Sequence, residues 1–174
     1  MLLRPRTLGF TLLELLVVLL IIGVMTSFAV LSIGNRTLSD RLDNEASRLA
    51  QLFVLAQDEA LFKRQEIGFF TDEERYGFLI PNGSGGWQPL TQSGPLRVRP
   101  FSEPFRGVLF VEGQPVAPPD PDDLEPAVLI LSSGDMTPFR LEIDAPSDPN
   151  LNEAIVRGDA LGRVQRGPAS DRDN

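Results

Sequence analysis

Glu14 is the residue whose type and setting most clearly suggest a function in this chain. It lies near the start of an apolar run that continues to Ile33, and it is the only charged residue in that run. A carboxylate inside a membrane-length apolar helix costs roughly 2.5–3.5 kcal/mol or more at the bilayer centre. An ordinary membrane anchor gains nothing from this cost, so we expect Glu14 to pair with a cation.

The apolar run is long enough to cross a bilayer. As a helix with about 1.5 Å rise per residue, Leu15–Ile33 measures about 28 Å, close to the bilayer core of about 30 Å. A secretory signal peptide is also basic at its start, but its apolar core of roughly 7–15 residues is shorter. Because Arg4 and Arg6 precede the span, the leader should stay cytoplasmic and the bulk of the chain should lie outside the inner membrane.

Gly9 and Phe10 lie at the junction between the basic leader and the apolar run, in the order Gly-Phe-Thr-Leu-Leu-Glu. This order resembles the class III signal of type IV pilins and type II secretion pseudopilins. The resemblance implies that prepilin peptidase cuts between Gly9 and Phe10 and that the new N-terminal Phe10 is N-methylated. The α-ammonium freed by the cut is then the natural partner of Glu14, on the same chain or on a neighbouring one.

Composition argues against catalysis. The 174 residues include neither His nor Cys, and the formal net charge is −8. Zinc sites of the usual ligand types, Cys–His nucleophiles and the Ser–His–Asp triad are therefore excluded. An acidic surface also disfavours nucleic-acid binding, and without disulfides the domain must be held by its core alone. We expect a protein that is not an enzyme, with no catalytic residue, cofactor or metal.

A single long helix is expected over the first part of the chain, because no proline occurs between Phe10 and Arg64. Its second half carries an apolar stripe of helical period, which favours packing on the chain's own domain over a separate coiled coil. The members of the stripe are Leu42, Ala46, Leu49, Phe53, Ala56 and Ala60. We expect five segments: a cleaved leader (1–9), a transmembrane half-helix (10–34), an amphipathic half-helix (35–65), a β-rich domain (66–166) and a disordered tail (167–174).

After residue 65 the pattern changes to short strands separated by turns. The expected strands are 67–71, 76–81, 87–90, 96–101, 108–112, 127–131, 139–143, 154–156 and 161–164. The first two should form a hairpin, and so should 127–131 and 139–143, with inward-facing Val128, Ile130, Phe139 and Leu141. Gly134 and Asp135 form the structural turn of this second hairpin, and Gly134 is expected to take a positive φ. Helix first and strands afterwards predict the α+β class, with a long helix packed on an antiparallel β-rich domain.

The segment from Val128 to Phe139 resembles the strand–turn–strand region of H-type minor pseudopilins, and the stripe and the strands at 76–80 and 87–90 fit the same family. The resemblance implies a pilin-like domain and a structural role in the pseudopilus of a type II secretion system. It implies a single-pass protein of the bacterial inner membrane with a periplasmic domain. The implied partners are prepilin peptidase, the major and other minor pseudopilins, and the inner-membrane assembly platform.

Two other functions remain open. One is a minor type IV pilin, including the kind that binds DNA during uptake, because Gly162–Arg166 resembles the basic C-terminal motif of such pilins. Alternatively, Arg163 and Arg166 are two surface arginines at the end of a strand, and the surrounding acids make nucleic-acid binding unlikely by charge. The other is a membrane-anchored enzyme using the Ser132–Asp135 cluster. That cluster lacks a base and is also typical of an ordinary turn.

The stretch from Pro115 to Pro126 combines five prolines with the acids Asp120, Asp122, Asp123 and Glu125. Carboxylates suit calcium, but the prolines interrupt any ordered ligand spacing. The sequence therefore leaves open whether residues 120–125 bind calcium or form a solvated acidic loop.

Overall fold

The computed structural model describes residues 12–121 and 123–168 and, for 26–36 and 168, the backbone alone. Two compact units divide the chain, Met1–Leu38 and Ser39–Asn174, and each is described by itself. Helix α1 runs Leu12–Lys63 and ends where Arg64 takes a left-handed φ of 54°. Glu14 in its first turn and Lys63 in its last turn complement the helix dipole. The single helix expected from the sequence is confirmed over its described part.

The first antiparallel sheet follows directly after α1. Its strands run in the order β3-β2-β1-β7, with β4 also paired to β2. Their bounds are β1 Ile67–Thr71, β2 Arg75–Pro81, β3 Trp87–Pro89, β4 Arg99–Pro100 and β7 Val128–Ile130. The β1–β2 hairpin matches the first hairpin expected from the sequence, with Phe69 opposite Phe78.

The second antiparallel sheet has the order β10-β9-β8-β5-β6. Its bounds are β5 Arg106–Val111, β6 Gln114–Pro115, β8 Phe139–Asp144, β9 Ala154–Gly158 and β10 Val164–Pro168. Strand β8 shows strict alternation of buried and half-buried side chains, as expected for a strand with one face on a core.

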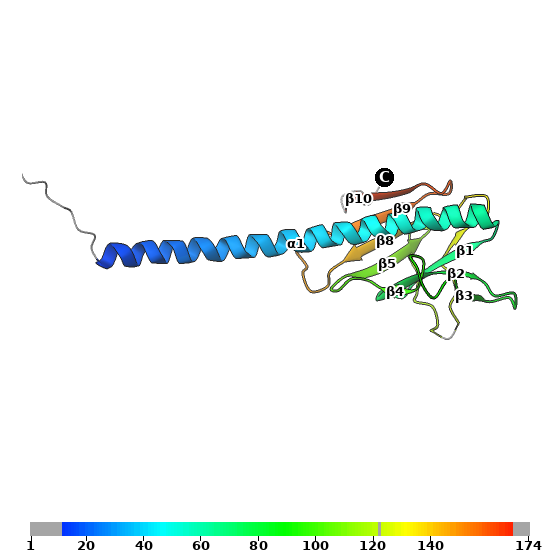
Figure 1. Ribbon diagram of the computed structural model, residues 1–174, viewed down its shortest axis with the longest axis horizontal. Coiled ribbons are helices and arrows are strands. Elements are labelled where there is room, and N and C mark those ends of the chain that lie inside the picture. The colour runs from blue at the N-terminus through cyan, green and yellow to red at the C-terminus, as the bar shows by residue number, and fades with distance from the viewer. Residues whose placement is uncertain (1–11, 122, 169–174) are drawn as a thin grey trace, which may run out of the picture. The chain divides into compact units, whose positions relative to one another are not determined.

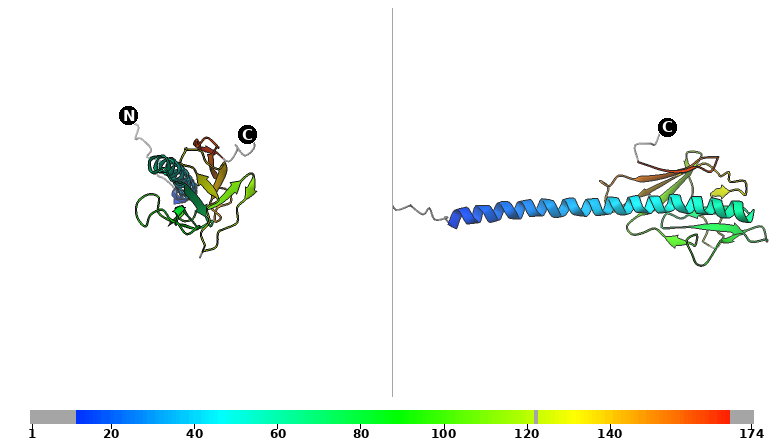
Figure 2. Two further views of the ribbon diagram at one scale, coloured as in Figure 1. Left: turned by 90° about the vertical axis from the view of Figure 1, so that its right-hand side faces the viewer. Right: turned by 45° about the horizontal axis from the view of Figure 1, so that its top comes forward.

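The core lies between the second half of α1 and the two sheets, whose strands run along this part of the helix (Figure 1 and Figure 2). All six members of the apolar stripe are buried. Phe53 joins both sheets: its ring centroid lies 4.6 Å from that of Phe69 and 5.6 Å from that of Phe78 in the first sheet. It lies 4.3 Å from the ring of Phe139 in the second sheet. The expectation that the stripe packs on the chain's own domain is confirmed.

The hairpin expected between 127–131 and 139–143 is wrong. Strand β7 pairs with β1, whereas β8 pairs with β5 and β9, so the two strands belong to different sheets. The four side chains expected to face inward are buried. Phe139, however, enters the core from the second sheet, where its ring stacks on Phe53. A shorter hairpin forms instead, nearer the turn: Leu131 N–H donates to Asp135 O at 2.8 Å, Thr137 N–H donates to Leu129 O at 2.9 Å, and Ile130 forms an antiparallel bridge with Met136.

Most other strands differ from the expectation by one or two residues at a boundary, and the short strand β6 was not expected; two strands differ by more. The strand expected over 96–101 is reduced to Arg99–Pro100, and the one expected over 161–164 lies at Val164–Pro168, extending into the tail expected over 167–174. The second shift has a local cause. The Asp159 carboxylate accepts hydrogen bonds from the N–H groups of Leu161 and Arg163, which commits residues 159–163 to a turn.

The turn at Gly134 is held by contacts from two other segments. Gly134 has a φ of 93°, which confirms the expected positive φ. Its carbonyl accepts a hydrogen bond from Gln57 Nε2 of α1 at 2.6 Å. A Cβ at Gly162, in the β9–β10 turn, would lie 2.3 Å from the same carbonyl oxygen. Both turns therefore need glycine where they meet α1.

We predict that Gly134→Val lowers the free energy of unfolding of the fragment 35–174 by roughly 1–3 kcal/mol, because a β-branched residue resists this φ. The fragment contains the whole described core, which lies between Leu42 and Val156. Ser84→Val, in an exposed turn, is the control and should change stability by less than about 0.5 kcal/mol. Equal melting temperatures for Gly134→Val and the parent fragment would contradict the prediction.

Candidate assembly site

Glu14 lies in the first turn of α1 and is exposed. The described apolar side chains around it, from Leu12 to Met25, are also exposed, between 42% and 83%. The other residues expected to act in processing, Arg4, Arg6, Gly9 and Phe10, lie outside the described residues, so the pairing of Glu14 with the Phe10 ammonium stays a prediction. Within 12–121 and 123–168, no helix has both the length and the apolarity that a membrane crossing requires.

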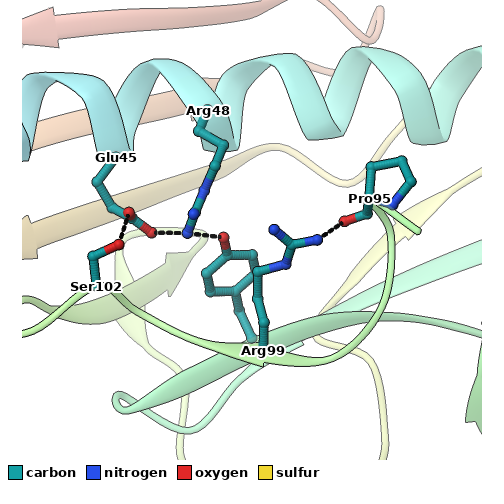
Figure 3. A network of polar contacts seen from close by, with 6 residues as sticks. Glu45, Arg48, Pro95, Arg99 and Ser102 are labelled. Atoms are coloured by element: carbon teal, nitrogen blue, oxygen red, sulfur yellow. Dashed lines mark hydrogen bonds and ion pairs between the residues drawn. The ribbon is translucent and has the colours of Figure 1, made fainter. Parts of the chain in front are cut away.

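A polar cluster lies beneath α1 in the domain, where Glu45 is buried within the helix's inward face (Figure 3). One carboxylate oxygen of Glu45 accepts from Arg48 Nη2 at 2.5 Å, and the other accepts from Ser102 Oγ at 2.8 Å. Arg48 Nη2 also donates to the Tyr76 hydroxyl on β2 at 2.8 Å. The cluster thus joins α1 to the first sheet and to the loop before β5.

Further arginines hold the loops that surround this cluster. Arg99 Nη2 donates to the carbonyl of Pro95 at 2.7 Å (Figure 3). Arg41, on α1, donates to the carbonyl of Glu103, and its guanidinium lies 5.8 Å from the Phe105 ring centroid. Only two residues of the segment from Pro95 to Phe105 form a strand. The Arg99 contact holds the segment internally, while Arg41 and a backbone hydrogen bond from Phe101 N–H to Glu74 O attach it to the rest of the domain.

Burial changes the titration of this cluster. It raises the pKa of Tyr76 above the usual 10.0, while the charge and hydrogen bond of Arg48 act in the opposite direction. Burial likewise lowers the pKa of Arg99 below its usual value. The hydrogen bonds of the cluster connect α1 to the first sheet and to the loop before β5. We interpret it as structural.

Sequence analysis missed this cluster, although a signal was present. Glu45 lies three residues after Leu42 and four before Leu49, so the spacing of the stripe itself places it on the buried face. Arg48 follows three residues later, within reach of an ion pair on the same helix. A charged residue inside an apolar stripe, with an opposite charge one turn away, predicts a buried pair.

Arg163 and Arg166 are both engaged inside the chain. Arg163 Nε lies 2.6 Å from Asp159 Oδ2 within the β9–β10 turn. Hydrogen bonds from Arg163, first from its backbone N–H, keep the pKa of Asp159 below its usual value. Arg166 donates to Asp43 O at 3.0 Å and to Ser47 Oγ at 2.8 Å, both on α1. The two arginines stabilise the C-terminal hairpin and attach it to the helix.

Two further clusters were candidate sites, the turn Ser132–Asp135 and the acidic loop 120–125. In the Ser132–Asp135 cluster, Ser133 Oγ donates to Asp135 Oδ2 at 2.8 Å, so this hydroxyl is engaged within its own turn. For the acidic loop, the described residues contain no group of three or more His, Cys, Asp or Glu side chains that could hold a metal ion. Asp122 of that loop lies outside the described residues.

Comparison with solved structures defines the class of protein. The crystal structure of the minor pseudopilin EpsH from the type II secretion system of Vibrio cholerae is similar, with a TM-score of 0.63 at 20% identity. The match covers 75% of this chain and 97% of that one. The type IV minor pilin FimU of Pseudomonas aeruginosa matches at a TM-score of 0.51 and 16% identity, over 76% of this chain and 92% of that one. The fold is that of the pilin-like proteins.

Sequence comparison is more specific. Residues 45–165 match the family described as "Type II transport protein GspH", and residues 4–30 match the "Prokaryotic N-terminal methylation motif". Type II secretion system protein H of Pseudomonas aeruginosa is 35% identical over 145 residues, covering 78% of this chain and 81% of that protein. The chain therefore belongs to the GspH family of minor pseudopilins, which are structural subunits of type II secretion systems. This result favours secretion over the type IV pilus alternative.

The single tyrosine of the chain permits a direct test of the buried cluster. We predict that phenolate absorbance of the folded fragment 35–174 titrates above pH 10.0, and that it returns to about 10 in urea. Because the folded-state pKa is raised, the contribution of Tyr76 to stability is constant below pH 10.0 and lost as pH rises through the folded pKa. Arg48→Gln should raise the midpoint further. A folded-state midpoint at or below 10.0 would contradict the burial argument.

We predict that Glu45→Ala destabilises the same fragment by roughly 1–3 kcal/mol, since Arg48 and Ser102 lose a charged acceptor in a partly dehydrated site. Glu59→Ala provides the matched control, because Glu59 pairs with Lys63 at the helix surface. That exposed pair should contribute less than about 1 kcal/mol. Chemical denaturation measures the free energy of unfolding of both variants. Equal decreases in the two variants would show that the buried cluster contributes no more to stability than the surface pair.

Proposed function

We propose that the chain is made as a precursor that is cut between Gly9 and Phe10, methylated at Phe10, and held in the inner membrane by residues 10–34. The domain lies in the periplasm until the protein enters the pseudopilus, where it acts as a non-enzymatic subunit in the export of folded proteins. The methylation motif over residues 4–30 supports this processing route.

The observation that carries the proposal is the exposed apolar surface of α1 from Leu12 to Met25. Contiguous apolar surface of this kind normally marks a contact with lipid or with another protein. A processed pseudopilin needs both in turn: lipid around the helix before assembly, and the helices of other subunits afterwards. The same segment can meet both needs because lipid tails and apolar side chains are chemically alike.

Glu14 can fix how neighbouring helices are aligned along their axes when their apolar surfaces pack together. In lipid its carboxylate is costly, whereas between helices it can pair with an α-ammonium. Only the cut after Gly9 creates such an ammonium at Phe10, so processing and assembly are linked. Breaking a buried pair typically costs about 3–5 kcal/mol, enough to discriminate one helix register from another.

Orientation follows from the leader. Arg4 and Arg6 favour a cytoplasmic leader under the positive-inside rule. This places the junction at Gly9 where a prepilin peptidase could reach it and leaves the domain on the far side. The proposed partners are therefore that peptidase, the inner-membrane assembly platform, and the major and other minor pseudopilins.

The engaged arginines weaken the DNA-uptake alternative. Arg163 is paired with Asp159, and Arg166 with α1. Phosphate would compete with these internal acceptors, and the chain's net charge of −8 opposes the approach of a polyanion.

We predict that mass spectrometry of the protein extracted from membranes finds an N-terminal methylated Phe10. Replacing Gly9 by Val should leave the precursor uncut, because a branched side chain clashes at a junction that fits glycine. A substitution in the leader outside the junction, Thr7→Val, serves as the control and should still be cut. An N-terminus at any other residue would be incompatible with the proposed processing.

We predict that Glu14→Ala leaves membrane insertion and cleavage intact, because it removes a charge from the apolar segment, while incorporation into the filament falls. Glu14→Gln should behave like Glu14→Ala, since it keeps the shape but loses the charge, whereas Glu14→Asp should retain part of the function. Crosslinking to other pseudopilins, together with secretion, measures the effect. Unchanged crosslinking and secretion in Glu14→Ala would exclude the proposed charge pair.

A further inference from the structure

A row of four paired residues crosses the second sheet. Phe110 on β5 lies opposite Arg140 on β8, Arg140 lies opposite Arg157 on β9, and Arg157 lies opposite Gln165 on β10. Directly paired residues of neighbouring antiparallel strands point to the same face of a sheet. The four side chains therefore form one continuous band across strands that Figure 1 shows side by side.

This band lines an open groove of about 550 Å³. The turns at the end of the sheet complete the lining, with Glu112 after β5, Pro138 before β8, and Asp159 and Arg163 between β9 and β10. The groove thus combines guanidinium groups with the apolar surfaces of Phe110 and Pro138.

Two arginines face each other in this band. Like charges directly opposite each other on neighbouring strands repel, and Arg140 faces Arg157 in this way. Arg140 is partly compensated, because its Nη2 lies 3.6 Å from Glu142 Oε1 and its guanidinium lies 4.5 Å from the Phe110 ring centroid. Arg157 also has an interaction within the chain. An arginine has five N–H donors, so these internal contacts leave both guanidinium groups with capacity for a ligand.

The groove also differs in charge from the rest of the chain. Its lining has three arginines and two acids in a protein whose net charge is −8. Of the two acids, Asp159 already accepts hydrogen bonds from the β9–β10 turn and from Arg163. Arg163 is therefore partly neutralised by Asp159. Arg140 and Arg157, the two central members of the band, are the arginines placed to bind an anion.

We propose that this groove binds an acidic segment of another protein, whose carboxylates pair with Arg140 and Arg157 while its apolar groups contact Phe110 and Pro138. Planar guanidinium groups bind carboxylates through paired hydrogen bonds. A nucleic acid fits less well, because two arginines neutralise few phosphates and the lining includes apolar surface. Naming the partner as a protein rests on the proposed assembly role, whereas the recognition of carboxylates does not.

The test uses the full chain in a neutral detergent and a fluorescently labelled hexaglutamate peptide, with hexaglutamine as the uncharged peptide. Fluorescence anisotropy should detect weak binding of hexaglutamate that falls with added salt. The double variant Arg140→Gln and Arg157→Gln should weaken binding by about tenfold or more, as expected when charge-assisted hydrogen bonds are lost. If the double variant does not fold, Arg157→Gln alone should weaken binding by at least about threefold.

Arg97→Gln is the matched control, because it makes the same charge change at an exposed arginine in a different part of the domain. Equal weakening by this control would mean that only overall charge matters and would overturn the proposal. Equal binding of hexaglutamine, or no binding of hexaglutamate at millimolar concentration, would also overturn it. Tighter binding of a short DNA duplex than of the peptide would replace the protein partner by a nucleic acid.

The proposal about the groove and the proposed assembly role can be disproved independently. Loss of peptide binding in the groove variant, with Phe10 processed and the domain folded, tests the groove alone. An N-terminus other than Phe10, with peptide binding intact, would remove the assembly role and leave the groove as a carboxylate site.

Discussion

The domain depends on one helix face serving as the common wall of two sheets. Phe53 is the centre of that wall, because it contacts Phe69 and Phe78 on one side and Phe139 on the other. A buried aromatic side chain removes roughly 150–250 Å² from water, and aromatic pairs add a further ~0.5–1.5 kcal/mol each. The alanines at positions 46, 56 and 60 are fully buried. Their small side chains let the sheets approach the helix closely enough for these rings to meet.

Polar contacts determine the positions of the loops, which apolar packing alone does not determine. Apolar burial has little directional preference, so it cannot by itself set the position of the poorly paired segment between β3 and β5. The Glu45–Arg48–Tyr76 cluster and the Arg41 contact to Glu103 supply that direction. At the other end of the helix, Gln57 does the same for the turn at Gly134. Arg41, Glu45, Arg48 and Gln57 all come from α1, so the helix helps to determine the loop positions as well as the core.

The sequence predicted the elements better than their partners. The helical stripe is periodic over several turns, and β1 and β2 are close in sequence, so both were predicted correctly. Strand β7 lies in a continuous apolar run and β8 alternates apolar with charged residues, and neither pattern tells which sheet the strand joins. Their assignment depends on distant residues, notably the contact of Phe139 with Phe53. The attachment of Arg166 to α1 is likewise invisible in sequence, because more than a hundred residues separate the partners. Glu45 could have been recognised from its position within the stripe.

The candidate processing site, unlike the strand partners, could be predicted from the sequence alone. Gly9, Phe10 and Glu14 could be predicted from the sequence because they belong to a linear motif, and the fold of the domain adds little to that signal. The two parts of the protein then divide the work of assembly. An apolar helix surface adheres to any similar helix, so it gives strength with little choice of partner. Choice requires surface that is unfavourable when unpaired and favourable with the correct partner. A pair of facing arginines such as Arg140 and Arg157 contributes such surface, because a partner's carboxylates would reduce the repulsion that remains beside the internal contact of Arg140 with Glu142. In the proposed assembly, selection among subunits therefore falls to the domain, while the helix supplies cohesion.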